Sequence, residues 1–133
     1  MGVPTALRPR PVKPAPPTVD AAEVEALFDS IPDVLFFIKD LEGRYTHVNA
    51  TMLRRLGLRS RREIIGKRAS EAYPGGMGAT YGLQDQQVLE GAVIDNLLEL
   101  QLFPDQEPGW CLTCKRPLLV DGRVGGLFGT SPA

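Results

Sequence analysis

The feature that most constrains this chain is residues 33–49, whose pattern predicts two β-strands joined by a tight turn. Residues 34–39 are mostly β-branched or aromatic, which is typical of a strand that packs against other elements. Gly43 supplies the backbone freedom that a hairpin turn needs, and Asn49 is placed to cap a following helix. The segment therefore predicts an antiparallel hairpin around which the other elements pack.

Alternation along the first strand assigns its side chains to two faces. One face carries Val34, Phe36 and Ile38. The opposite face carries Leu35, Phe37 and Lys39. We expect the downstream helices to cover the first face, which makes Phe36 a fully buried core residue, and the helix before the strand to lie against the second.

A proline-rich leader, residues 1–19, precedes the domain. Six of its residues are proline, between Pro4 and Pro17, and its basic side chains have no acidic partner before Asp20. Such a segment buries too little apolar surface to order itself, so we expect disorder. It is either a solubilising leader or a docking tail for an SH3-like or acidic partner. Residues 20–133 are expected to form one domain.

An amphipathic helix is predicted from Ala21 to about Ser30. Asp20 is a suitable N-cap, Glu23 stands at the capping-box position, and Pro32 ends the helix. Its apolar stripe consists of Val24, Leu27, Phe28 and Ile31. The stripe must be buried, either on the first strand or on a second copy of the chain.

The remaining segments alternate between helix and strand signals. Short helices are predicted at 50–57 and 60–66, a longer one at 81–91, and strands at 93–102, 110–120 and 123–131. In the third strand we place Ile94, Asn96, Leu98, Leu100 and Leu102 on one side. The order of elements is typical of an antiparallel α+β domain.

Composition limits the classes of function. At 133 residues and 43% apolar content the chain can fill one core, and its formal net charge of −1 gives no field that attracts nucleic acid or anionic lipid. No apolar run approaches the ~20 residues of a membrane span, and no signal peptide is evident. We therefore expect a cytoplasmic protein that does not bind DNA or membranes directly.

The two cysteines and the single histidine predict neither a disulfide nor a metal site. Cys111 and Cys114 lie three apart in one predicted strand, so their side chains face opposite sides of the sheet. Zinc needs four ligands, and the chain adds only His47 to the pair. We expect free thiols, and a hydrogen-bonded surface role for His47.

Several segments, in their order and spacing, resemble a PAS sensor domain over residues 27–131. They are Ile31-Pro32-Asp33, Lys39-Asp40, Gly43-Arg44, Val48-Asn49, Ile65-Gly66-Lys67, Trp110, Lys115-Arg116-Pro117-Leu118 and the run from Asp121 to Leu127. Residues 102–113 further resemble PAS domains that precede AraC-type DNA-binding regions. The resemblance implies a PAS-like five-stranded antiparallel sheet with short helices over one face, which sometimes encloses a small-molecule cavity.

The same resemblance does not extend to the cofactor motifs of the family. Residues 60–90 contain no flavin-type cysteine motif, residues 81–91 contain no haem-type histidine, and both cysteines lie in the predicted fourth strand rather than at a thiol-chromophore position. No cofactor is therefore predicted. An unoccupied core or a pocket for a small, mostly apolar metabolite remains.

Candidate ligand-binding residues come from the predicted inward faces, with Asp85 and Asn96 as the best polar candidates. The set is Phe36, Ile38, Leu53, Leu56, Tyr81, Asp85, Val88, Asn96, Leu98, Leu112, Cys114 and Phe128.

The function expected from these observations is a sensory and dimerisation module of a bacterial-type signalling or transcription regulator. It acts by binding a small molecule or by protein–protein contact, and its DNA-binding or kinase output region is absent from this chain. We expect a homodimer, with an interface of Val24, Leu27, Phe28, Ile31, Leu35 and Phe37. The alternative is a stand-alone binding protein or an enzyme that uses the cavity. Because no triad-like grouping accompanies the one histidine, we do not expect an enzyme.

Overall fold

The computed structural model of the protein describes residues 14–73, 77–101 and 109–132. Residues 1–13 of the predicted leader and Leu102 of the predicted third strand lie outside these ranges. The elements are α1 (Ala21–Asp29), β1 (Val34–Asp40), β2 (Tyr45–Val48), α2 (Ala50–Arg55), η2 (Arg61–Glu63), α3 (Ala69–Ala72), α4 (Met77–Leu89), β3 (Ile94–Gln101), β4 (Gly109–Val120) and β5 (Arg123–Pro132).

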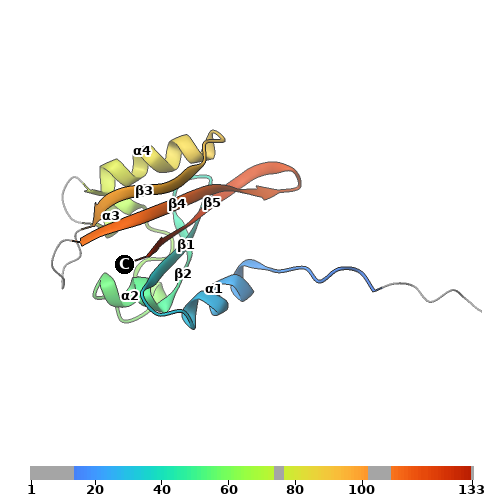
Figure 1. The fold of residues 1–133 in the computed structure, drawn as a ribbon, viewed down its shortest axis with the longest axis horizontal. Helices are drawn as coiled ribbons and strands as arrows, with labels where there is room; N and C mark the ends of the chain where they lie inside the picture. The colour runs from blue at the N-terminus through green and yellow to red at the C-terminus, as the bar shows by residue number, and fades with distance from the viewer. Residues whose placement is uncertain (1–13, 74–76, 102–108, 133) are drawn as a thin grey trace, which may run out of the picture.

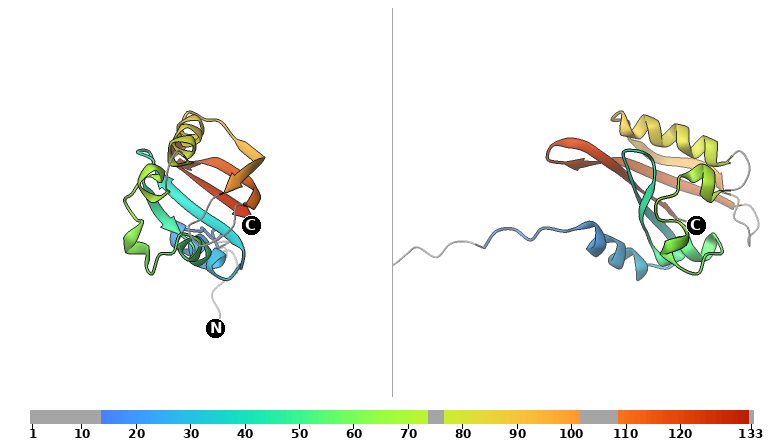
Figure 2. Two further views of the ribbon diagram at one scale, coloured as in Figure 1. Left: turned by 90° about the vertical axis from the view of Figure 1, so that its left-hand side faces the viewer. Right: turned by 180° about the vertical axis from the view of Figure 1, so that it is seen from behind.

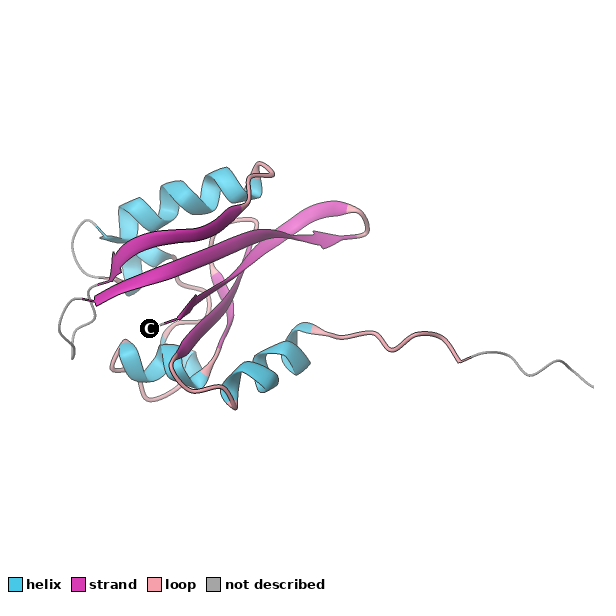
Figure 3. Ribbon diagram, viewed as in Figure 1, coloured by secondary structure: helices cyan, strands magenta, loops and turns pink. Residues whose placement is uncertain are grey.

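The strands form one five-stranded antiparallel sheet in the order β2-β1-β5-β4-β3 (Figure 1). The helix α4 packs on β4 and β5, whereas α1 and α2 lie next to β1 (Figure 1). Figure 3 shows the same arrangement by secondary structure, and in Figure 2 the exposed residues 14–19 lead away from the domain. The predicted α+β class and five-stranded sheet are confirmed. Within the described ranges, no helix is long and apolar enough to cross a membrane.

The predicted assignment of faces on β1 is wrong. Leu35 and Phe37 lie in the core with residues of α2, α3 and α4, and we call this side of the sheet the inner face. Phe36 lies on the opposite, outer face, where its ring stacks on Phe28 of α1 at 4.5 Å between centroids. Phe36 is buried as expected, but under α1. Leu35 and Phe37 are also excluded from a dimer interface, because they are 2% and 7% exposed inside the core.

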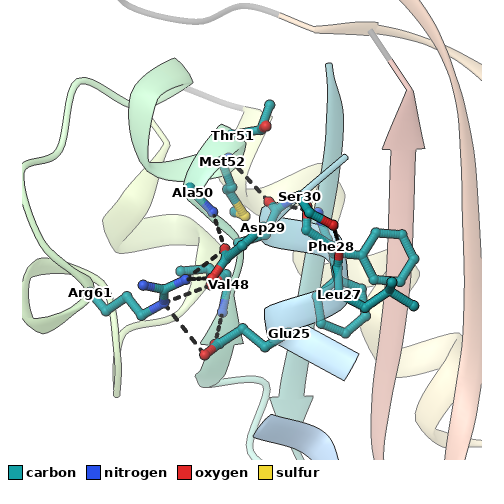
Figure 4. A network of polar contacts seen from close by, with 12 residues as sticks. Glu25, Leu27, Phe28, Asp29, Ser30, Val48, Ala50, Thr51, Met52 and Arg61 are labelled. Carbon is teal, nitrogen blue, oxygen red and sulfur yellow. Dashed lines mark hydrogen bonds and ion pairs between the residues drawn. The ribbon is translucent and has the colours of Figure 1, made fainter. Parts of the chain in front are cut away.

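The helix α1 forms as predicted and is fixed to the sheet by polar contacts. At its start, Asp20 accepts a hydrogen bond from the backbone N–H of Glu23 at 2.8 Å. Near its end, the two carboxylate oxygens of Asp29 accept from Nη2 of Arg61 at 2.7 and 2.8 Å (Figure 4). The Arg61 Nε also donates to the Val48 carbonyl at 3.0 Å. The strand β2 and η2 therefore hold one end of α1.

Asn49 connects three elements as well as capping α2. Its Oδ1 accepts from the backbone N–H of Met52 at 3.2 Å, which is the predicted cap, and from that of Phe36 at 3.1 Å. Its Nδ2 donates to the carbonyls of Phe28 and Val34 at 3.1 and 2.7 Å. All four partners are backbone groups, so this one side chain joins α1, β1 and α2.

The predicted alternation of β3 is also wrong. An irregularity between Ile94 and Leu97, with Asn96 at φ +49°, shifts the phase of the strand. Glu99 and Gln101 consequently face the interior, and Leu98 and Leu100 face outward at 60% and 38% exposure.

The glycines of β5 allow the close approach that their pattern suggests. A Cβ at Gly129 would lie 2.7 Å from both the Cys114 carbonyl oxygen and the ring of Phe37. Gly129 pairs with Lys115 of β4, so its missing side chain leaves room between β1 and β4 for groups on the inner face. The cysteines are free thiols, as expected: Cys111 is buried and Cys114 half-buried.

Candidate functional site

A small cavity lies on the inner face of the sheet. It is bounded by α4 and by Tyr73, the residue that follows α3. Its lining residues are Phe37, Lys39, Tyr45, Tyr73, Tyr81, Glu99, Gln101, Thr113, Lys115 and Ser131. Its free volume of about 20 Å³ is room for roughly one water molecule. Six of the ten lining residues are charged or carry an amide or hydroxyl group, and three more are tyrosines, which is unusual for the centre of a small domain.

Two buried lysines share one buried aspartate beside this cavity. Lys39 of β1 and Lys115 of β4 are 1% and 3% exposed, and Asp85 of α4 is 3% exposed. The Lys39 ammonium donates to one oxygen of Asp85, and the Lys115 ammonium donates to the other at 3.0 Å. Lys115 also donates to Oε1 of Gln84 at 3.0 Å. Buried charges persist only when they are paired in this way.

Aromatic rings supplement the single carboxylate. The Lys39 ammonium lies 4.4 Å from the centroid of the Tyr45 ring and 5.3 Å from that of Phe37. The Lys115 ammonium lies 5.5 Å from the Tyr81 ring and 5.7 Å from Phe37. Ring faces attract cations at these distances, so they stabilise the second ammonium that Asp85 alone does not neutralise.

Burial changes the acid–base properties of the cavity. It lowers the pKa of the Lys39 ammonium to about 8, against the attraction of Asp85. It raises the pKa of the Tyr81 phenol to about 12, with a smaller contribution from Glu99, and it raises the pKa values of Tyr45 and Tyr73 as well. At neutral pH the phenols therefore keep their protons and can donate hydrogen bonds.

Two polar atoms in the cavity have no hydrogen-bond partner among the described residues: the Tyr81 hydroxyl and Oε1 of Glu99. The other oxygen of Glu99 accepts from Nε2 of Gln84 at 2.6 Å. A buried polar atom without a partner costs about 1–3 kcal/mol. The cavity thus presents one donor and one acceptor that a bound molecule could satisfy.

At another part of the cavity wall, hydroxyl, amide and thiol groups bond to one another. The hydroxyl of Ser131 accepts from Nε2 of Gln101 at 2.8 Å and donates to Sγ of Cys111 at 3.2 Å. It also lies 3.2 Å from the Thr113 hydroxyl. Because these groups satisfy one another, a bound molecule is expected to contact the lysines, Tyr81 and Glu99 instead.

A larger groove lies on the other side of Asp85. It has a volume of about 550 Å³ and is lined by Leu41, Glu42, Gly43, Arg68, Ala69, Ser70, Gly78, Ala79, Gly82, Asp85, Gln86 and Leu89. Gly78 lets α4 approach α3 closely, because a Cβ there would lie 2.6 Å from the Ala69 carbonyl oxygen. Asp85 borders both this groove and, through its lysine partners, the cavity.

The structure separates the predicted ligand-binding residues into two groups. Tyr81, Asp85, Val88, Leu53 and Leu56 lie on the inner side, in the core or beside the cavity. The others lie on the outer face or point into solvent, because the faces predicted to point inward in β1, β3, β4 and β5 are the outer ones. They are Phe36, Ile38, Asn96, Leu98, Leu112, Cys114 and Phe128. Asn96 is exposed and bonds to Cys114, so it is not a cavity residue.

Sequence reasoning missed the two lysines. The alternation of the strands could have indicated them. Lys39 stands two residues after Phe37, and Lys115 stands two residues after Thr113, so each lysine shares a face with a buried residue. Among the described residues, no group of three or more His, Cys, Asp or Glu side chains is placed to hold a metal ion.

Comparisons with known proteins agree on the fold. A family model described as the PAS fold matches residues 28–131, whereas a search of curated proteins found no match. The structure of VqmA bound to DPO superposes with a TM-score of 0.70 at 23% identity, over 83% of this chain and 56% of VqmA. The complex of Vibrio cholerae VqmA with ligand and DNA gives 0.71 at 23% identity, over 86% and 52%.

A domain of a sensory box sensor histidine kinase/response regulator from Geobacter sulfurreducens gives a TM-score of 0.59 at 20% identity, over 84% of this chain and 92% of that domain. The chain spans about half the length of the VqmA structures that it matches. At these identities the likeness shows the fold alone.

Proposed function

The chain belongs to the PAS fold family, and from this premise we propose that it is a sensory module. It binds a small molecule in the inner cavity and acts through a second copy of itself on an output region. The observation that carries the proposal is the pair of unpartnered buried atoms, the Tyr81 hydroxyl and Oε1 of Glu99, next to two lysines that share one carboxylate.

Polar groups in this state are costly for a purely structural core, and they are expected where a ligand supplies the missing partners. The neighbouring structures support this use of the fold, since one contains VqmA bound to DPO and another contains VqmA with ligand and DNA. The free volume is smaller than any metabolite, so binding requires the cavity to open. We propose that it opens toward the large groove, which Asp85 also lines.

The output region is proposed to be the DNA-binding part of a transcription regulator or a sensor kinase. The neighbours include a ligand–DNA complex and a domain of a sensor histidine kinase, and both support this choice over catalysis. Such output regions act in the cytoplasm, where we place the protein. The AraC-type association suggested by residues 102–113 stays a prediction.

We propose a homodimer that forms through the outer face of the sheet. Four large apolar residues of β3 and β4 are exposed there and form the outer apolar patch: Leu98, Leu100, Trp110 and Leu112. They pair across the two strands, Leu98 with Leu112 and Leu100 with Trp110, so the patch is continuous. Leu27 of α1 is exposed at 60% and offers a further contact. Exposed apolar surface of this kind marks interaction sites, and the dimeric VqmA supports a second copy as the occupant.

Native mass spectrometry of freshly purified protein tests both parts of this proposal. We expect the mass of two chains together with a small added mass that disappears on denaturation. A Tyr81→Phe variant should retain less of the added mass, because it loses the unpartnered hydroxyl. A monomer without added mass, whose melting temperature no compound of a broad metabolite library raises, would overturn the proposal.

A further inference from the structure

We propose that the cavity accepts a small hydroxycarboxylate, and that Asp85 is an internal carboxylate which occupies the ligand's position until the ligand displaces it. This inference rests on the proposed sensory function and names the class of ligand and the change that its binding causes.

The contacts of Asp85 define a binding position for a carboxylate. One ammonium approaches it from β1 and another from β4, and each bonds to a different oxygen of the same group. A ligand that replaces Asp85 is expected to bring a negative charge, since a neutral molecule would leave Glu99 as the one carboxylate of the cavity lining for two buried ammonium groups. A carboxylate reproduces both bonds and has the size of the group that it replaces.

The unpartnered atoms add a second requirement. The Tyr81 hydroxyl can donate to a carboxylate, but Oε1 of Glu99 needs a donor. A hydroxyl group next to the ligand carboxylate supplies that donor. The combination of two ammonium groups, one phenol and one free carboxylate oxygen therefore selects a hydroxy acid over a simple acid.

The groove beside α4 offers space for the displaced Asp85 side chain. Asp85 of α4 lines the 550 Å³ groove and bonds to two lysines that line the cavity. We infer that a rotation of its side chain would turn the carboxylate into this groove, where water can solvate it. The ligand thereby removes the ionic link between α4 and strands β1 and β4, which changes how α4 is held on the sheet.

Calorimetric titration of the full chain with matched compounds tests the class of ligand. The probes are glycolate and lactate, their neutral amides glycolamide and lactamide, and acetate and propionate, which lack the hydroxyl. We expect the amides to bind at least about tenfold more weakly than the hydroxy acids, and the simple acids to fall between them. Equal binding of lactate and lactamide, or no binding of any carboxylate, would overturn the inference.

Substitutions test the role of Asp85. Asp85→Asn should bind the hydroxy acids about tenfold more tightly, because the internal competitor loses its charge, and Lys115→Met should abolish binding. Asp95→Asn is the matched control, because Asp95 is exposed and pairs with Arg116. It should bind like the wild type. Unchanged affinity in a folded Asp85→Asn variant would overturn the displacement step.

If Asp85→Asn does not fold, Glu99→Gln provides a second measurement. Because its amide can donate as well as accept, the preference for lactate over propionate should fall toward one; an unchanged preference would contradict the hydroxyl's role. A neutral compound retained in native mass spectrometry, with no binding of carboxylates, would remove this inference and leave the sensory function standing. Absence of any ligand would remove both.

Discussion

On its inner face, turned toward α2, α3 and α4, the sheet buries two lysines, whereas on its outer face β3 and β4 expose leucines and Trp110. The same strands produce both effects. In β4, Thr113 and Lys115 point inward while Leu112 points outward, and in β3 Glu99 points inward while Leu98 points outward. This is the reverse of the usual arrangement for a sheet with one solvated face.

This reversal indicates a different role for each face of the sheet. A face that buries charges needs paired groups or a ligand, and a face that exposes large apolar side chains needs a partner. The inner face therefore suits recognition of a small polar molecule and the outer face suits association. Stability measurements can test this division, because the two faces respond to different substitutions.

The largest effect is expected from Asp85→Leu on the inner face. It removes the carboxylate that both buried ammonium groups share, so the free energy of unfolding should fall by about 3–5 kcal/mol. Urea denaturation measures the change. Asp95→Leu serves as the control: its exposed pair with Arg116 at 3.2 Å should be worth less than about 1 kcal/mol. Similar losses for both variants would show that the carboxylate shared by the two buried lysines contributes no more to stability than an exposed ion pair.

A smaller effect is expected from Phe36→Ala on the outer face. The change leaves a cavity under the stacked ring of Phe28 and should cost about 3 kcal/mol, the low end for a buried phenylalanine, because α1 is free to move toward the sheet. Thermal unfolding with a helix-sensitive signal measures it. Phe36→Leu retains most of the volume and should cost under about 1.5 kcal/mol. A wild-type midpoint for Phe36→Ala would show that α1 contributes little to the fold.

Local signals in the sequence predicted the elements well. Asp20 and Asn49 cap the helices that they were expected to cap, and Gly43 lies in the hairpin turn with φ +76°. Each of these signals acts within a few residues. The number and order of strands followed from them, together with the resemblance to PAS domains.

The faces and the site could not be predicted in the same way. Both faces of β1 are apolar apart from Lys39 and the terminal Asp40, so alternation alone does not say which face meets the core. The phase of β3 depends on the irregularity at Asn96, which has no glycine or proline to indicate it. Lys39 and Lys115 meet only because β5 lies between β1 and β4, which is a consequence of the whole topology.

A third effect concerns pH and again distinguishes the inner face. The pKa of Lys39 is about 8 in the folded protein and about 10.4 in the unfolded chain, so between these values the unfolded state binds more protons. Stability should therefore rise with pH through this window. From pH 7.5 to 9.5 we expect a gain of about 2 kcal/mol from Lys39.

The control for this effect is Lys39→Met, measured over the same pH range. The wild type should gain stability relative to this variant as pH rises toward 9.5, because the variant has no ammonium to release. The measurement stops below pH 10. Above this value the raised pKa values of Tyr45 and Tyr73 lower the stability as pH rises, which opposes the effect of Lys39. Parallel curves for the two proteins would show that Lys39 stays charged in the fold.

The smallest effect on stability, and the sharpest test of the outer face, is expected from Leu112→Glu. Leu112 is 45% exposed and belongs to the outer apolar patch, so the charge should change the stability of a single chain by only about 0.5 kcal/mol. It should nevertheless convert the proposed dimer to a monomer, because a buried carboxylate without a partner is not tolerated at an interface. Light scattering measures the mass. Val120→Glu is the matched control, since Val120 is equally an exposed apolar residue of β4 but lies at the turn into β5, away from the patch. A Leu112→Glu variant that stays dimeric, or a Val120→Glu variant that dissociates as readily, would place the contact elsewhere.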